Sequence, residues 1–466
     1  MNKTLVAGLI VLVVSACTVG PDYQRPEVTV PADWTVSYEA ATGLIDSAWW
    51  QQFDDPVIDE LVSTALMNNL DLKIAVARVD GYLGQLRTTR SEYFPQIGVS
   101  ASASRQDDTD TGMVSPGGPY NYYQGTVFAA WEIDLWGRVR RLNEAARAEL
   151  LASEAGRRGV LLSLVSNVVG NYIILRGYDR QLEINRETEQ AYADSLRIFR
   201  LRHKYGTVSG VEVSQVESEY EDAAQAIPQL ETLVAQQEHL LSLLLGRNPD
   251  SIPRGKTIDE LVVTDIPAGL PSVLLERRPD IIQAEQSLIA ANARIGVARA
   301  LYFPRISLTG ALGTASINSG DLFDGDSQTW QVGGDLLGPI FTFGAIEGQV
   351  MASEAAQREA LFQYRQAIIS AFREVEDALV ATTKGRERQT AQGRRTRALE
   401  NYQRLATYQF DAGTTGYLQV LDANRSLFSS QLDYVQTQTT AFTSLIDVYR
   451  AMGGGWVDEA DRMTAK

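Results

Sequence analysis

Residues 138–204 read RVRRLNEAARAELLASEAGRRGVLLSLVSNVVGNYIILRGYDRQLEINRETEQAYADSLRIFRLRHK and contain no proline. At about 1.5 Å per residue, one helix over this stretch would be roughly 100 Å long. Apolar side chains recur at helical spacing, as at Leu161, Leu164 and Val165. A globular domain does not need a helix of this length, whereas an antiparallel coiled-coil assembly does.

The same pattern recurs 207 residues later. Ala345–Asp411 is a second proline-free run of equal length, and Gly206-Thr207 after the first run matches Gly413-Thr414 after the second. Upstream, Tyr93-Phe94-Pro95 reappears as Tyr302-Phe303-Pro304 at an offset of 209 residues. The chain is therefore a duplicated unit, and two similar halves must carry its function together.

Each long run turns back into a second helical segment. Val211–Leu245 follows the first Gly-Thr pair, and Leu418–Met452 follows the second. We therefore predict two long helical hairpins, at about 138–245 and about 345–452, packed in the manner of coiled coils.

Four shorter segments alternate between apolar and polar residues, which is the period of a β-strand. The predicted strands cover about 95–104, 123–134, 304–313 and 329–338. Their apolar positions are Ile97, Val99, Ala101 and Ala103, then Val127, Ala129, Trp131 and Ile133, then Ile306, Leu308 and Leu312, and finally Trp330, Val332 and Leu336. Strands of about ten residues fit two structures, namely soluble hairpins with one wet face or tilted strands that cross an outer membrane. The pattern alone leaves both open.

Composition limits the classes of partner and site. The chain has 58 acidic and 42 basic side chains and a formal charge of −16, which argues against nucleic-acid binding. His203, His239 and Cys17 are too few for a structural zinc site, which needs about four ligands. No nucleophile motif or phosphate-binding glycine loop is present. We predict a protein that is not an enzyme, with no catalytic residue, no metal site and no cofactor.

Cys17 ends a short apolar segment at the N-terminus. Lys3 precedes the apolar residues 5–14, and Ser15 and Ala16 directly precede the cysteine. Two interpretations fit, an ordinary secretory signal with an incidental cysteine or a bacterial lipoprotein signal cleaved before Cys17. In the second case Cys17 carries acyl chains, each buried CH₂ contributing about 0.8 kcal/mol to membrane anchoring. Thr18 then favours sorting to the outer membrane. No later run of 18 apolar residues occurs, so a membrane span would have to use strands.

The predicted organisation follows from these segments. Residues 1–16 are a lipoprotein signal peptide, 17–55 a lipid-anchored tether rich in proline and tryptophan, 56–249 the first structural repeat, 250–271 a linker, 272–453 the second structural repeat, and 454–466 a C-terminal tail.

Several motifs resemble one family over essentially the whole mature chain. They are Cys17-Thr18-Val19-Gly20-Pro21-Asp22-Tyr23, Leu270-Pro271-Ser272-Val273-Leu274-Leu275-Glu276-Arg277-Arg278-Pro279-Asp280-Ile281, the paired Tyr-Phe-Pro elements, and Leu421-Asp422-Ala423. With the duplicated hairpins, they are similar to the TolC-like outer membrane factor family, in particular to its lipoprotein branch of OprM-like and NodT-type factors of RND efflux.

The resemblance implies a fold that is mainly α with a membrane β-barrel. One chain supplies four strands, which are too few to close a barrel, and an open edge inside lipid is prohibitive. The family is trimeric, so three chains would form a 12-stranded β-barrel and a long periplasmic α-helical barrel. The family resemblance implies further that the linker 250–271 belongs to an equatorial belt.

The resemblance also implies a gate at the hairpin turns. Leu418 and Asp422 are four residues apart and therefore share a helix face. They match family positions that constrict the pore with an apolar ring and a carboxylate ring, although Asp422 is also compatible with a plain exposed helix residue. The tip residues expected to contact an adaptor and close the tunnel are Gly206, Thr207, Glu212, Gly413 and Thr414. Thr415 and Phe410 stand where some members carry an Arg–Tyr latch, so that latch is in doubt.

The implied function is an outer membrane exit duct that passively exports small molecules such as drugs. The implied partners are two further copies of the chain, a periplasmic adaptor (membrane fusion) protein, an inner-membrane RND transporter and outer membrane lipid. An exit duct for peptide secretion or metal efflux fits the same sequence. A periplasmic coiled-coil adaptor lipoprotein fits less well, because this chain repeats its hairpin and has few strands.

Overall fold

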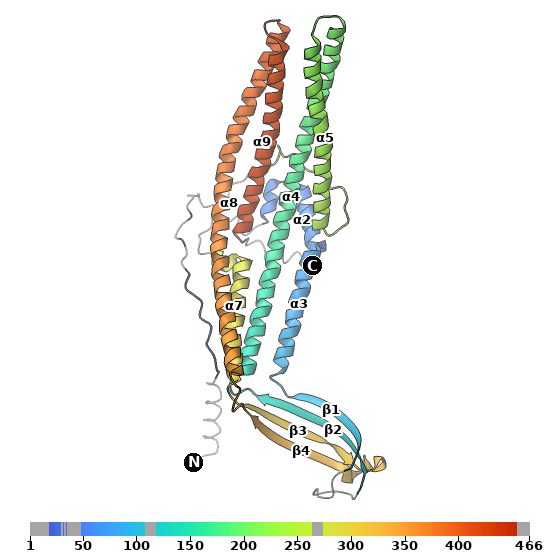
Figure 1. Ribbon diagram of the computed structural model, residues 1–466, viewed down its shortest axis with the longest axis vertical. Coiled ribbons are helices and arrows are strands. Elements are labelled where there is room, and N and C mark those ends of the chain that lie inside the picture. Colours follow the sequence, from blue (N-terminus) through green and yellow to red (C-terminus); the bar gives the residue numbers. More distant parts are fainter. Residues whose placement is uncertain are drawn as a thin grey trace. The chain divides into compact units, whose positions relative to one another are not determined.

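The computed structural model describes residues 18–28, 31, 34, 48–107, 118–262 and 274–453. The chain divides into two compact units, each drawing on both halves of the sequence (Figure 1). We call Met1–Val28, Ala77–Glu154 and Gln283–Gln366 the strand unit, and Thr29–Val76, Ala155–Ile282 and Ala367–Lys466 the hairpin unit. Cys17, the predicted lipidation site, lies outside the described residues, as do parts of the predicted tether and linker and the whole predicted tail.

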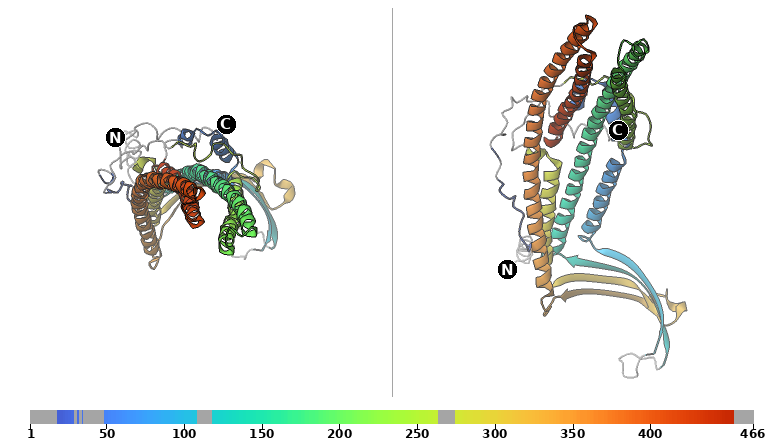
Figure 2. Two further views of the ribbon diagram at one scale, coloured as in Figure 1. Left: turned by 90° about the horizontal axis from the view of Figure 1, so that it is seen from above. Right: turned by 45° about the horizontal axis from the view of Figure 1, so that its top comes forward.

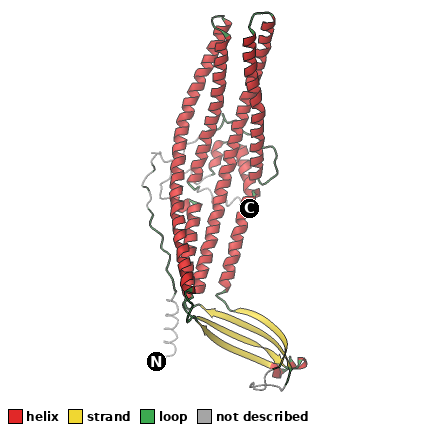
Figure 3. Cartoon of the chain, in the orientation of Figure 1, coloured by secondary structure: helices red, strands yellow, loops and turns green. Residues whose placement is uncertain are grey.

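Helices dominate the described chain, with a single small sheet (Figure 3). The helices are α2 (Pro56–Asn68), α3 (Leu70–Ser91), α4 (Arg138–Lys204), α5 (Gly210–Leu244), α6 (Leu274–Arg277), α7 (Pro279–Ala300), α8 (Ala345–Asp411) and α9 (Tyr417–Ala451), with a 3-10 helix η1 (Trp49–Phe53) before α2. The strands are β1 (Gln96–Gln106), β2 (Tyr120–Ile133), β3 (Arg305–Ser316) and β4 (Gln328–Leu337). Prolines open α2 and α7, where a missing backbone N–H costs no hydrogen bond.

The duplication is kept residue by residue along the hairpins. Helices α4 and α8 each have 67 residues, and α5 and α9 each have 35. The two copies of each helix begin 207 residues apart, the spacing of the sequence repeat. Insertions and deletions have therefore been excluded from both hairpins, as the register of a coiled coil requires.

The strand unit contains one antiparallel sheet in the order β1-β2-β3-β4. Strand β2 of the first copy pairs with β3 of the second, from Tyr123 opposite Ser316 to Ile133 opposite Ile306. The strands of the two copies are therefore not separate hairpins, because this central pairing joins them into one sheet.

The predicted apolar positions lie on one face of this sheet. Val99 lies opposite Val127, Val127 opposite Leu312, and Leu312 opposite Trp330. Directly opposed residues share a face, so these four side chains form a row across the sheet. They are 80%, 53%, 65% and 75% exposed in the single chain. An apolar row this exposed needs a cover that a single chain does not provide.

An N-terminal strap, residues 18–28, lies against helices α4 and α7 in the strand unit. The contacts that hold it are Val19 N–H to Trp136 O (3.0 Å), Asn292 Nδ2 to Pro21 O (3.0 Å), Arg141 Nη2 to Asp22 Oδ1 (2.6 Å), Tyr23 Oη to Glu285 Oε1 (3.1 Å) and Arg25 Nη2 to Glu285 Oε2 (2.9 Å). Gly20 packs on Gly296 so closely that a Cβ at position 20 would lie 2.5 Å from the Gly296 Cα. The residues that directly follow Cys17 are therefore bound to the body of the strand unit.

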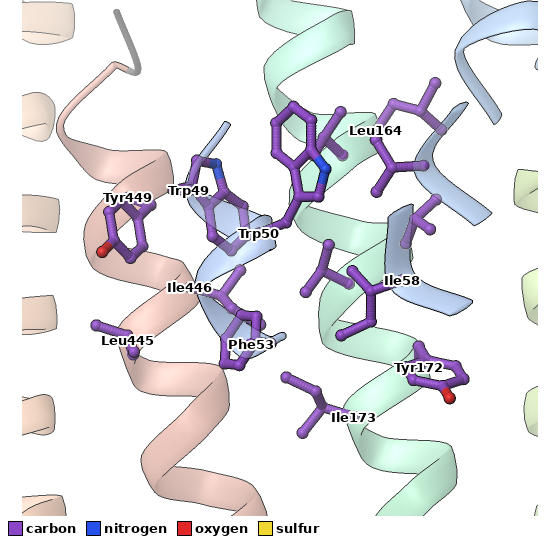
Figure 4. Packing of buried hydrophobic residues seen from close by; sticks show 14 of the residues in the cluster. Trp49, Trp50, Phe53, Ile58, Leu164, Tyr172, Ile173, Leu445, Ile446 and Tyr449 are labelled. Atoms are coloured by element: carbon purple, nitrogen blue, oxygen red, sulfur yellow. The ribbon is translucent and has the colours of Figure 1, made fainter. Parts of the chain in front are cut away.

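The hairpin unit has an aromatic core, which Figure 4 shows. Trp49 is fully buried and stacks on Tyr449 of α9 with 4.8 Å between ring centroids. Phe53 meets Phe442 edge-on at 5.9 Å, and Tyr172 of α4 lies in the same cluster. The expectation of an extended tether up to residue 55 is wrong at its end, because burial of these large rings stabilises η1 against α4 and α9.

Helix α4 contains an 18-residue window that is apolar enough to cross a membrane by composition. Of that window, 56% is buried inside the protein. Leu161, Val165 and Val168 of α4 are fully buried in the same core cluster as Trp49. These side chains are apolar because they form the core of the hairpin unit, so the window is weak evidence for a membrane span.

Candidate gate at the hairpin tips

Both long hairpins end in the same backbone turn. Gly206 and Gly413 have φ angles of +73° and +70°, a left-handed conformation that glycine adopts without strain. The Gly206 N–H donates to His203 O at 2.9 Å, and the Thr207 N–H donates to Arg202 O at 3.0 Å. Gly413 and Thr414 repeat these bonds at 2.9 and 3.0 Å, and each threonine hydroxyl also donates to the same carbonyl as its own N–H, at 2.9 Å. Both turns are Schellman motifs, which satisfy the last carbonyls of α4 and α8.

The return helices start differently in the two copies. Ser209 caps α5, its side chain accepting from the Glu212 N–H, while the Glu212 carboxylate accepts from the Ser209 N–H at 2.7 Å. Gly416 begins α9 without a side-chain cap. Sequence reasoning missed this local role of Glu212, although Ser209-Gly210-Val211-Glu212 has the S-x-x-E signature of a capping box.

Leu418 and Asp422 lie on an exposed face of α9. The Leu418 side chain is 65% exposed, and Asp422 is exposed one turn further along the helix. The neighbouring positions Tyr417, Val420 and Leu421 are buried in a cluster described below. The two predicted gate residues thus lie one turn apart on the exposed face of α9. They are held there because the other face of α9 is buried.

Tyr402 of α8 restrains the Asp422 carboxylate. Its hydroxyl donates a hydrogen bond to Asp422 Oδ2 at 3.3 Å. Burial and the neighbouring Asp422 charge raise the pKa of Tyr402, so Tyr402 stays a protonated donor over the physiological range. Sequence reasoning did not predict this contact.

A second apolar cluster joins the two hairpins near their tips. Figure 2 shows the backbones of these hairpins, with α4 and α5 in teal to green and α8 and α9 in orange to red. The Phe199 ring of α4 packs on Tyr417 of α9 with 4.1 Å between centroids, and Phe410 of α8 meets Tyr417 at 5.3 Å. The Arg202 guanidinium lies 5.8 Å from both the Phe199 and the Phe410 rings. Phe410, at the position of the doubtful latch, is therefore a packing residue.

An ion pair crosses between the hairpins beside this cluster. Arg425 Nη1 of α9 lies 3.8 Å from Glu219 Oε1 of α5. Burial raises the pKa of Glu219, the Arg425 charge lowers it, and burial dominates. Burial also raises the pKa of Tyr192, whose hydroxyl has no hydrogen-bond partner among the described residues. Polar groups left imperfectly paired inside an apolar cluster weaken it locally.

Apolar side chains are exposed at both hairpin tips. Among the described residues, no group of three or more His, Cys, Asp and Glu side chains is placed to hold a metal ion. Tyr205 in the first turn and Val211, Tyr408 and Leu418 at the adjoining helix ends are 73%, 67%, 73% and 65% exposed, which is a high density of apolar surface for two hairpin tips. Such a surface is typical of an interface with another chain.

Curated relatives align with this chain over nearly its whole length. A probable efflux pump outer membrane protein, TtgC of Pseudomonas putida, is 34% identical over 98% of this chain and 97% of the relative. The cation efflux system protein CusC of Escherichia coli O6:H1 is 33% identical over 96% of this chain and 97% of the relative.

Solved structures of outer membrane channels have the same fold. The Campylobacter jejuni CmeC outer membrane channel matches with a TM-score of 0.90 at 27% identity, over 97% of this chain and 98% of CmeC. The open state of the Neisseria gonorrhoeae MtrE outer membrane channel matches with a TM-score of 0.86 at 31% identity, over 94% of this chain and 99% of MtrE. The predicted fold class, mainly α with a membrane β-barrel and a duplicated strand-hairpin and helical-hairpin unit, is therefore confirmed.

The sequence model of one family, described as "Outer membrane efflux protein", matches the chain twice. It covers residues 61–247 and 270–454, one match for each copy of the duplicated unit. These two ranges make up more than half of the chain. The chain belongs to the outer membrane efflux protein family.

Proposed function

We propose that three copies of this chain form the exit channel of a tripartite RND-type efflux system, gated by Leu418 and Asp422 at the hairpin tips. The exposed apolar row Val99–Val127–Leu312–Trp330 is the observation that supports a membrane location most directly. Lipid provides the cover that such a row needs, and the polar opposite face then lines water.

The trimer follows from the edges of the sheet. In the described chain, β1 and β4 each pair on one side only, so each keeps a row of unpaired backbone groups. An unpaired edge inside hydrocarbon costs several kcal/mol for each unsatisfied group. Three copies of four strands close a barrel of about twelve strands, within the size range of outer membrane barrels.

The gate residues act by size and by charge. Three Leu418 side chains converging on an axis form an apolar constriction, and three Asp422 carboxylates one turn further form a ring that favours cations. Tyr402 supports this assignment because its hydroxyl holds the exposed Asp422 carboxylate through a hydrogen bond. The first-copy counterparts, Val211 and Gln215, carry no charge.

The tips are the proposed contact for a periplasmic adaptor, which links the channel to an inner-membrane RND transporter. Gly206, Thr207, Gly413 and Thr414 form the turns that the adaptor would meet. Glu212 is engaged in the cap of α5, so we assign its contribution to the shape of the first tip. Acyl chains on Cys17 are the proposed second attachment to the outer membrane.

The proposed cargo is small apolar or amphipathic molecules, including drugs. Relatives at 34–35% identity are named for antibiotic, solvent and toluene efflux. Metal-ion export is the alternative, because the relative CusC is named for cation efflux at 33% identity and an Asp422 ring would attract cations. The substrate range of the inner-membrane pump that delivers the cargo would distinguish drug export from metal-ion export.

Single-channel recording in planar bilayers tests the proposal. Leu418→Ala should raise the conductance, and Asp422→Ala should reduce the preference for cations over anions. The matched controls Val211→Ala and Gln215→Ala, at the same positions of the first copy, should change neither quantity. Conductance and selectivity unchanged in both gate variants would remove these residues from the gate, and absence of any channel would overturn the proposed function itself.

A further inference from the structure

An open cavity of about 720 Å³ lies in the strand unit between α3, α4 and α7. Arg90 and Tyr93 line it from α3 and the turn that follows, and Arg140 and Arg147 line it from α4. Ile289 of α7 contributes an apolar wall. The tip mechanism does not use this cavity.

The cavity is cationic within an acidic protein. Three arginines and one carboxylate, Glu144, line it, whereas the chain as a whole has a formal charge of −16. Glu144 is already bound by Arg141 at 2.8 Å, and Arg140 reaches Asp134 at 3.4 Å. Within the part of the chain that the structure describes, Arg90 and Arg147 have no carboxylate partner. Two guanidinium groups are thus available to a ligand, and their planar donors suit phosphate oxygens.

The cavity lies where the helices meet the strands. Tyr93 precedes β1 by three residues, and the Trp131 indole of β2 donates to the Tyr93 carbonyl at 3.0 Å. Arg140 lies in the first turn of α4, shortly after β2 ends. If the strands span the membrane, this junction is at the level of lipid headgroups on the periplasmic side.

The cavity also shares a helix face with the N-terminal strap. Ile289 lines the cavity, and it lies four residues after Glu285 and three before Asn292, which both bind the strap. Residues at such spacing are neighbours on one face of a helix. Arg141 connects the two features directly, because it binds both Glu144 in the cavity wall and Asp22 in the strap. The lining of the cavity and the contacts of the strap are therefore neighbours on α7 and α4.

We infer that this cavity binds the phosphate of an anionic phospholipid from the periplasmic leaflet, with Arg90 and Arg147 as its ligands. The inference rests on the proposed function in so far as the strands must be in the outer membrane. Basic pockets between helices at a membrane surface bind lipid headgroups, and each arginine there contributes attraction to anionic lipid. The ligand supplies the negative charge that the two guanidinium groups lack within the chain.

Native mass spectrometry of the detergent-solubilised assembled protein provides the test. The probe is dioctanoyl phosphatidylglycerol, compared with dioctanoyl phosphatidylcholine and with inorganic phosphate. The double variant Arg90→Gln/Arg147→Gln should bind phosphatidylglycerol about tenfold or more weakly. The matched double variant Arg78→Gln/Arg87→Gln removes two exposed arginines of α3 outside the cavity, and its binding should equal that of wild type.

A second variant covers the case in which the double variant fails to assemble. Gln286→Glu places a carboxylate in the cavity wall with almost no change in shape, and it should weaken binding of phosphatidylglycerol but not of phosphatidylcholine. Equal loss in the cavity and control variants would overturn the inference. Inorganic phosphate that binds as tightly as the lipid and displaces it would overturn the assignment to lipid. Conductance in a bilayer, measured separately, reports on the channel function and not on this site.

Discussion

Arg425 of α9 and Glu219 of α5 lie 3.8 Å apart and connect the two helical hairpins near their tips. The Glu219 side chain is only 15% exposed, whereas Arg425 is 69% exposed. A long, half-exposed pair of this kind contributes little stability, because solvent screens it. Burial nevertheless disfavours the charged form of the Glu219 carboxylate. The stability of this contact between the hairpins therefore depends on whether Glu219 is protonated.

We expect the stability of the tips to depend on pH through Glu219. Burial raises its pKa above the ordinary 4.5, so the folded protein takes up a proton more readily than the unfolded chain does. The penalty for the buried charge is fully present above the raised pKa and disappears as the pH falls toward about 4.5. Glu219→Gln should therefore raise the melting temperature near neutral pH, and this advantage should shrink as the pH is lowered.

The control for this prediction is Glu221→Gln, an exposed position on the same helix. Its melting temperature relative to wild type should stay nearly constant over the same pH range. An advantage of Glu219→Gln that does not vary with pH would contradict a raised pKa at Glu219.

The variant Tyr402→Phe distinguishes the effect of the orientation of the Asp422 carboxylate on ion selectivity from the effect of its charge. The substitution removes the hydroxyl that donates to Asp422 Oδ2 and leaves the carboxylate in place. Bilayer recordings should therefore show cation preference retained in Tyr402→Phe and lost in Asp422→Ala. Loss of selectivity in both variants to the same extent would mean that orientation, and not charge, governs the ring.

The capping box of α5 should be transferable to the second hairpin. Ser209→Ala removes a cap that contributes about 1 kcal/mol, so the amides at the start of α5 should exchange with solvent about fivefold faster. Gly416 has a φ of −79° and a ψ of 159°, which serine accepts, and Gln419 stands three residues later. Gly416→Ser should therefore build an equivalent box and slow exchange at the start of α9 by less than about twofold.

Hydrogen exchange measured by mass spectrometry gives the exchange rates at the start of α5 and at the start of α9 in one experiment. Peptides from the middle of α5 and α9 serve as the internal reference, since a cap acts on the first turn only. Faster exchange in Gly416→Ser would show that the second tip requires an uncapped start.

Two glycines of α8 and its turn should respond to alanine with opposite signs. Gly413→Ala places a side chain at a φ of +70° and should destabilise the turn by about 1–2 kcal/mol. Gly348→Ala lies inside α8, where a new Cβ meets nothing within 4 Å, and should stabilise the helix by about 0.5–1 kcal/mol. Melting temperatures of the two variants check this, and a Gly413→Ala protein that melts at or above the temperature of wild type would contradict the Schellman assignment.

The sequence was sufficient to predict the helices and strands, but it was insufficient to predict the contacts between them. The absence of proline and the 207-residue repeat placed both hairpins, because helical spacing and turn residues are local properties. The alternation placed the four strands, but only the pairing of β2 with β3 showed that both copies build one sheet. That pairing brings together residues that are between 173 (Ile133 and Ile306) and 193 (Tyr123 and Ser316) positions apart, which no local pattern encodes.

At the candidate gate too, local features could be predicted from the sequence and contacts between helices could not. Leu418 and Asp422 could be predicted to share a face, since the spacing of four residues decides it. The partner Tyr402 depends on the register between α8 and α9, and Glu219–Arg425 depends on how two hairpins pack. The role of Glu212 was readable from Ser209 and its spacing, so that omission came from an overlooked local signal.

The sheet of the strand unit leaves the single chain incomplete in a thermodynamic sense. Its apolar row is exposed, and its outer strands have no partner on one side among the residues that the structure describes. A lone protomer therefore has no environment, aqueous or lipid, in which every group of the sheet is satisfied. Folding of the sheet, association of copies and entry into the bilayer are then one coupled equilibrium. A free energy of unfolding assigned to one protomer has no defined value without its concentration and the lipid present.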